Sequence, residues 1–137
     1  MYQIQRKNRI YEQLQLVHAN GDIACTIDVD INVDKIGAKI NKAYELLGIA
    51  QLELEKNATS AEAIDAYGEA VLCLFKVIFG DDGCKKIVDF YGNEDAWSEM
   101  LIDLFPFIND EIIPKVREAS EARKKQLLEM AKVAKRK

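Results

Sequence analysis

The chain has 137 residues, of which 49% are hydrophobic and 31% are charged, and its formal net charge is −4. This length is typical of one domain with its own core, and the composition is that of a globular protein. The N-terminal sequence MYQIQRKNRI lacks the apolar stretch of a secretory signal, and the longest apolar run, residues 70–79, is too short to cross a bilayer. We therefore expect one domain over residues 1–137, in the cytoplasm and without a membrane partner.

The residue types that carry chemistry are few and scattered. The cysteines Cys25, Cys73 and Cys84 are odd in number and widely spaced, which indicates reduced thiols and no disulfide framework. Cys73 lies in the most apolar stretch, so we expect it to be buried and inert. The single histidine, His18, has no second histidine or cysteine pair with which to bind zinc. No glycine-rich phosphate loop is present, and we expect no catalytic, metal or cofactor site and no enzymatic activity.

Charge is distributed unevenly along the chain. Residues 115–137 contain nine Lys or Arg and three Glu, a net charge of +6, which leaves −10 for residues 1–114. A basic tail on an acidic body can bind nucleic acid. This tail has no aromatic residue for base stacking, and Lys and Arg at the C-terminal end of a helix also suit the helix dipole without any partner. We therefore predict a basic helical tail and do not expect nucleic acid as its partner.

The N-terminal part of the sequence predicts a flexible lead-in at residues 1–9, followed by a β-hairpin at residues 10–32. Apolar residues occupy every second position from Ile23 to Ile31 and alternate with Ala24 and then with polar residues, which is typical of a strand with one wet face. Asn20-Gly21, between this run and the preceding one, is a strong signal for a hairpin turn. Two strands alone are marginally stable, so the hairpin must pack on helices or pair with another chain.

The acidic sequence DVDINVD, residues 28–34, resembles the start of a calcium-binding loop. The match fails further on, because the position that requires glycine is Val33 and the position that requires a bidentate glutamate is Lys39. We interpret the acids as the solvent face of the strand and expect Asp34 to cap the next helix.

Residues 34–114 are predicted to form a helical core. Apolar residues recur at steps of three and four in the first helix, which ends near Lys56, and Thr59 is a candidate cap for the second. The middle of the second helix is apolar on nearly all sides, so we expect it to lie at the centre, and the sequence GDDG at residues 80–83 to end it. With a short helix at residues 84–91, the pattern predicts an α+β fold, mostly α: the hairpin followed by four to five helices.

The most distinctive helix lies beyond Tyr91-Gly92-Asn93, where glycine is suited to end one helix and asparagine to begin another. It contains the only tryptophan and an apolar stripe, and Pro106 falls inside the stripe. A proline within a helix removes one hydrogen bond, so we predict a bend at Pro106. The bent helix is either simply part of the core or also one side of a groove for a partner. The residues that we assign to partner binding are Trp97, Met100, Leu101, Phe105, Phe107 and Ile108.

Three segments together resemble a known family. DVDINVD running into a helix, FYGN before an acidic helix with tryptophan, and LFPFINDEIIPKV are similar to the tail assembly chaperones of long-tailed bacteriophages and prophages of Gram-positive bacteria. This resemblance covers most of residues 22–116. It implies an α-rich, non-catalytic protein that binds the tape-measure protein, keeps it soluble before the tail tube polymerises, and forms homo-oligomers. For self-association we favour the hairpin and the tail, with residues Ile23, Ile27, Leu127 and Met130.

Two other functions remain open on the sequence alone. The chain can be a helical adaptor that joins proteins of a different phage or bacterial complex. It can also be a regulator that binds nucleic acid through the basic tail.

Overall fold

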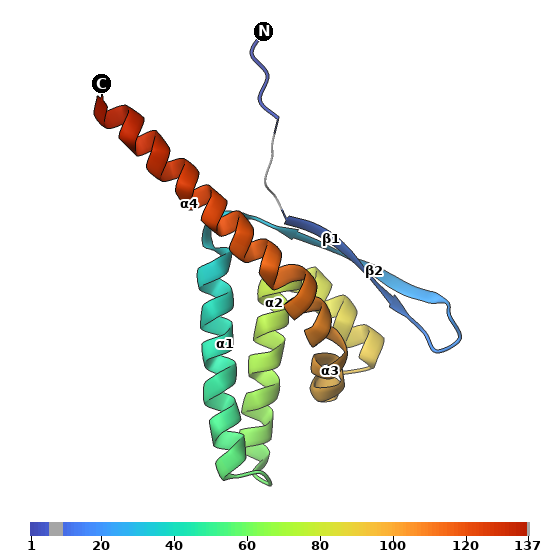
Figure 1. Cartoon of the computed structure of the whole chain (residues 1–137). Coiled ribbons are helices and arrows are strands. Elements are labelled where there is room, and N and C mark those ends of the chain that lie inside the picture. Colours follow the sequence, from blue (N-terminus) through green and yellow to red (C-terminus); the bar gives the residue numbers. More distant parts are fainter. Residues whose placement is uncertain (6–9, 137) are drawn as a thin grey trace.

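The structure is a computed structural model that describes residues 1–5 and 10–136. Residues 1–5 form neither helix nor strand and are exposed, and residues 6–9 of the predicted lead-in lie outside the described residues. The described part is an N-terminal antiparallel hairpin followed by helices (Figure 1). A mostly helical α+β fold is therefore confirmed.

The hairpin consists of β1, Ile10–Val17, and β2, Ile23–Ile31, paired antiparallel with Leu14 opposite Ile27. Its turn is stabilised by Asn20, whose side-chain oxygen accepts a hydrogen bond from the Asp22 N–H at 3.0 Å, and by Gly21, which adopts φ +94°. The left-handed conformation at Gly21 costs little because glycine has no Cβ. The hairpin predicted at residues 10–32 is thus confirmed. Along β2, every second residue from Ile27 to Ile31 is buried, while Asp28 and Asp30 between them are exposed.

Helix α1, Val33–Lys56, carries the predicted apolar stripe toward the core. The predicted cap was wrong by two residues. Asn32 caps the helix, with its side-chain oxygen accepting a hydrogen bond from the Asp34 N–H at 3.3 Å. Asp34 lies instead in the first turn, where its negative charge interacts favourably with the positive end of the helix dipole. It also forms an ion pair with Arg123 at 2.8 Å.

Helix α2, Ala61–Tyr91, runs back beside α1 and then turns under the hairpin (Figure 1). Its cap is Ser60, not the predicted Thr59, because the Ser60 hydroxyl accepts a hydrogen bond from the Ala63 N–H at 3.3 Å. Gly80 has φ +75° and ψ 172°, a non-helical conformation that changes the direction of the helix. The sequence GDDG therefore bends α2 and does not end it, contrary to the prediction.

The C-terminal part is one continuous helical path, here called the α3–α4 rod. After Asn93, which caps the 3₁₀ turn η1, Glu94–Ala96, the rod runs through α3, Trp97–Phe107, the π-helical stretch η2, Ile108–Ile112, and α4, Ile113–Arg136. Pro106 and Pro114 flank η2, where the Ile113 N–H donates to the Ile108 carbonyl. Proline has no backbone N–H to donate, so the regular helical hydrogen bonds are lost at Pro106 and Pro114. The π turn between them lets the helix continue with a different pattern of backbone hydrogen bonds.

The predicted number of four to five helices was therefore wrong: the described residues form three. Prolines do not interrupt the rod, the tail continues it, and the segment after Gly80 remains part of α2. The core lies where α2 meets α1, the hairpin and the rod. The largest fully buried side chains come from the hairpin, α2 and the rod: Ile27, Val29, Val71, Leu74, Phe75, Ile87, Met100, Ile108 and Ile112.

Only the first part of α4 packs on the body. Val116 is buried and Ala119 is partly buried against the core, whereas every residue from Lys124 to Lys135 is exposed. Figure 1 shows the end of α4 extending beyond the rest of the molecule. The basic tail is thus a projecting helix.

Candidate protein-binding groove

The position of α3 on α2 is fixed by a close contact between Trp97 and Gly68. A Cβ added at Gly68 would lie 2.6 Å from Trp97 Cδ1, so only glycine leaves room for the indole ring. The ring also packs against Tyr67, with ring centroids 5.1 Å apart. Beyond this contact, residues of α3 and of the lower half of α1 line a common depression, with Tyr67 of α2 between them.

The depression is an open apolar hollow of about 510 Å³, here called the α1–α3 groove. Its lining comes from α1, α2 and α3: Tyr44, Leu47, Gly48, Gln51, Tyr67, Leu101, Ile102, Phe105 and Pro106. No charged side chain is among these residues. Ile102 is 74% exposed and Phe105 is 39% exposed, which is unusual for large apolar side chains that line the same hollow. The groove can therefore accept an apolar surface from another molecule.

A second hollow of about 290 Å³ continues the first along α1. It is lined by Gly37, Ile40, Asn41 and Tyr44 of α1 together with residues of α4 from Ile113 to Glu121. Tyr44 belongs to both hollows, and its partial burial raises the pKa of its phenol. From Gly37 to Gln51, α1 spans about 21 Å at 1.5 Å per residue. That length corresponds to about four turns of a helix.

The six residues assigned to partner binding do not form one surface in the structure. Leu101 and Phe105 line the groove, whereas Trp97 does not line it and packs instead against the lining residue Tyr67. Phe107 is partly buried and stacks on Phe79, with ring centroids 6.3 Å apart.

Met100 and Ile108 must be removed from the predicted partner surface. Both are 0% exposed and belong to the hydrophobic core cluster. Their apolar character serves the core. Sequence reasoning also missed Ile102, which is the most exposed apolar side chain of the groove. The sequence contained an indication of this, because Ile102 directly follows Leu101. Two adjacent apolar residues make the apolar surface of α3 wider than a single buried stripe, so one of them could be expected to face outward.

The four residues assigned to self-association also differ in position. Ile23 is exposed near the hairpin turn, and Leu127 and Met130 are exposed on the projecting part of α4. Ile27 is only 1% exposed and packs in the core, so it must be removed from the proposed contact. Ile27 lies on the face of β2 that packs against the helices.

The polar residues of the hairpin form a separate surface. Asp28 accepts hydrogen bonds from Gln13 and from the Tyr11 hydroxyl, each at 3.0 Å, and these bonds lower the pKa of its carboxyl group. Within the described residues, no group of three or more His, Cys, Asp or Glu side chains has the arrangement of a metal site.

The cysteines differ from the prediction in one respect. Cys73 is exposed, so its expected burial was wrong, because α2 turns this position away from the core. Cys84 is buried, and this burial raises the pKa of its thiol. A raised pKa disfavours the reactive thiolate. His18 lies near Phe90, with ring centroids 5.6 Å apart.

Among the described residues, no helix is both long enough and apolar enough to span a membrane. No protein-family model, curated protein or solved structure matches the chain. The assignment of a role therefore depends on the chemistry of the surfaces just described.

Proposed function

We propose that this protein is a non-catalytic tail assembly chaperone of a long-tailed bacteriophage or prophage. In this role it binds the tape-measure protein in the host cytoplasm and keeps it soluble before the tail tube polymerises. The observation that carries the proposal is the α1–α3 groove, with Ile102 and Phe105 exposed beside a charge-free lining. The segments that resemble the family support it, because LFPFINDEIIPKV contributes Phe105 and Pro106 to the lining.

The geometry suits the recognition of a helix. An amphipathic helix presents apolar side chains at steps of three and four, and an apolar groove between two helices accepts such a stripe. Burying one large apolar side chain contributes about 1.5–3 kcal/mol and association itself costs about 4–15 kcal/mol, so a contact through a few such anchors stays reversible. Reversibility is needed, because the chaperone must release its client when the tube subunits arrive.

The client would benefit directly from this contact. The resemblance implies a client that is long and helical, and an apolar stripe on such a helix would be exposed until the tube surrounds it. Covering such stripes removes the surfaces through which it would aggregate. This function requires no catalytic residue.

Co-expression with the candidate tape-measure protein tests the proposal. We expect the tape-measure protein to remain soluble with the wild-type chain and to precipitate when it is expressed alone. A tape-measure protein that is equally insoluble in both cases would contradict the chaperone function. If the chain instead copurifies with a different protein of the same gene neighbourhood, the adaptor function is favoured.

One observation favours a second candidate, a nucleic-acid-binding regulator. The projecting part of α4 presents several lysines to solvent, among them Lys124, Lys125 and Lys132. A basic helix of this kind can contact phosphates. A mobility-shift assay at two salt concentrations distinguishes the candidates, because binding through phosphate contacts weakens steeply as salt is raised. Absence of a shift at low salt would exclude this function.

A further inference from the structure

The α1–α3 groove lies between two acidic segments of the chain. Residues 43–75, which include the lower half of α1 and the first half of α2, contain six acidic residues and one cation, Lys56. Residues 91–114, which include α3, contain six acidic residues and no Lys or Arg. The lining of the groove itself has no charged side chain. The groove is therefore an apolar hollow whose surroundings carry negative charge.

On α1, Glu55 brings this charge to the edge of the groove. It lies four residues after the lining residue Gln51, so the two side chains share one face of the helix. The Gln51 side-chain amide donates a hydrogen bond to the Glu55 carboxylate at 3.5 Å. Lys56 follows Glu55 directly and so points about 100° away around the helix. The carboxylate of Glu55, and not the ammonium of Lys56, therefore lies in line with the groove.

On the other side of the groove, α3 presents Glu99. This residue lies three positions before Ile102, the most exposed apolar side chain of the groove, so the two are neighbours on the surface of α3. Asp103 also lies on α3, but it accepts a hydrogen bond from Tyr91 at 2.8 Å. We therefore assign Glu99 to the edge of the groove.

Neither of these two carboxylates is neutralised within the described part of the chain. Glu55 and Glu99 are exposed, and no ion pair among the described residues includes either of them. The ion pairs of Glu12, Asp34 and Glu111 lie elsewhere, on β1, at the N-terminal end of α1 and on η2. Negative charge on both sides of an apolar groove favours a partner that carries cations beside its apolar surface.

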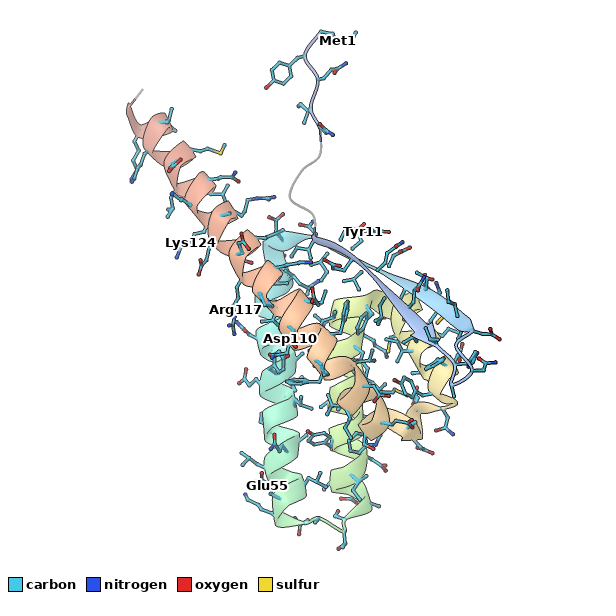
Figure 2. The ribbon with its side chains drawn as sticks, turned by 45° about the vertical axis from the view of Figure 1, so that its right-hand side comes forward. Met1, Tyr11, Glu55, Asp110, Arg117 and Lys124 are labelled. Carbon is cyan, nitrogen blue, oxygen red and sulfur yellow. The ribbon has the colours of Figure 1, made fainter. Side chains whose placement is uncertain are left out.

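The path along α1 has a different charge at its upper end. The second hollow, which continues the groove from Tyr44, is lined by Arg117 and Glu121 of α4, one charge of each sign. Figure 2 shows Arg117 on α4 beside the upper half of α1 and Glu55 toward the lower end of α1. The negative charge is therefore concentrated at the lower end, where the exposed apolar side chains also lie.

We propose that the α1–α3 groove is specific for a basic amphipathic helix, which carries Lys or Arg beside its apolar stripe. The stripe packs on Ile102 and Phe105, and the flanking cations face Glu55 and Glu99. The hollows along α1 extend about 21 Å, so the bound segment has about 14 residues, or about four helical turns. This inference rests on the proposed function, because it specifies which kind of segment of the tape-measure protein the groove accepts.

The two carboxylates also disfavour helices of the wrong charge. A helix with Asp or Glu beside its stripe would place like charges next to Glu55 and Glu99, and this repulsion weakens binding. An exposed ion pair contributes little to affinity. The apolar stripe therefore supplies most of the affinity, and the charges select among stripes that are equally apolar.

Three synthetic peptides test this specificity. Each has about 14 residues and the same Leu stripe at steps of three and four, and the flanking positions are Lys in the first, Gln in the second and Glu in the third. These three residue types have similar helix propensities, so the peptides differ mainly in charge. In titrations of the wild-type chain at low salt, we expect the Lys peptide to bind at least about threefold more tightly than the Gln peptide. The Glu peptide should bind more weakly than both.

Charge-reversed variants connect the preference with the two carboxylates. When Glu55→Lys and Glu99→Lys are combined, the order of affinities should reverse, so that the Glu peptide binds most tightly. Glu53→Lys is the matched control, because Glu53 is exposed on α1 but lies two residues before Glu55 and so on the opposite side of the helix. This variant should retain the wild-type order. If circular dichroism shows that the double variant is unfolded, Glu55→Gln with Glu99→Gln removes the charges instead and should abolish the preference.

The outcomes separate this inference from the proposed function. Equal affinities of the three peptides for the wild-type chain would overturn the charge specificity and leave the groove as a site for helices. An order that persists in the charge-reversed variant, or that is lost in Glu53→Lys, would also overturn it. If none of the peptides binds, the groove is not a site for helices, and the observation that carries the proposed function is lost as well.

Discussion

Trp97 rests on the bare backbone of Gly68, at a distance that leaves no room for a side chain at that position. A Cβ at Gly68 would lie 2.6 Å from Cδ1 and 2.7 Å from Nε1 of the indole ring. Gly68→Ala must therefore displace Trp97, and we expect a loss of about 1–3 kcal/mol in the free energy of unfolding, as for other overpacked sites. Chemical denaturation followed by the fluorescence of this single tryptophan measures both effects.

Gly48→Ala is the control for this substitution. Gly48 also lies in the interior of a helix, but a Cβ added there would have no atom within 4 Å. Since alanine has the higher helix propensity, we expect a gain of about 0.5–1 kcal/mol. Equal losses in the two variants would show that the contact between Gly68 and Trp97 is not the cause.

Tyr91 donates a hydrogen bond to Asp103 at 2.8 Å and thereby joins the end of α2 to α3. Partial burial, and then this bond, raise the pKa of the Tyr91 phenol well above 10.0. The folded chain holds this proton more tightly than the unfolded chain does. The resulting stability is therefore complete below about pH 10 and is lost as the pH rises through the folded-state pKa.

We thus expect Tyr91→Phe to lower stability at neutral pH and to weaken the loss of stability above about pH 10. Denaturation of both proteins at a series of alkaline pH values provides the measurement. Identical pH profiles for the variant and the wild type would contradict this assignment.

The thiols of Cys73 and Cys84 should differ in reactivity. Cys73 is exposed on α2, whereas Cys84 is buried with a raised pKa. We expect a thiol-alkylating reagent to modify Cys73 first in the folded protein and to reach Cys84 only on unfolding. Mass spectrometry of digested samples identifies the modified residue, and Cys73→Ser should remove the fast phase. Rapid modification of Cys84 in native buffer would disagree with its burial.

Much of the fold follows from local patterns in the sequence. The alternation along β2 and the glycine of Asn20-Gly21 specify a hairpin, because each depends on neighbouring residues alone. The stripe of α1 likewise specifies which of its faces is buried. The cap positions are shifted by one or two residues, since Asn32 and Ser60 provide side-chain oxygens as suitable as those of Asp34 and Thr59.

Other features depend on contacts that no local pattern specifies. The middle of α2 is apolar on nearly all sides, so periodicity could not show that Cys73 faces solvent. Pro106 predicts an irregularity, but whether the helix stops or continues through a π turn depends on the packing of Ile108 and Ile112 in the core. For the same reason the inner residues Met100 and Ile108 could not be separated from Ile102, which lies on the outer side of α3.

The central claim is that the α1–α3 groove binds the client, and it is tested most directly by comparing two matched variants in the same binding measurement. Ile102→Lys places a charge in the groove, and Ile49→Lys places the same charge on an exposed face of α1 outside it. In a titration with the tape-measure protein, we expect Ile102→Lys to weaken binding at least about tenfold, since about 1.4 kcal/mol of lost apolar contact corresponds to that factor. Ile49→Lys should bind like the wild type. Equal affinities of Ile102→Lys and the wild-type chain would contradict the claim.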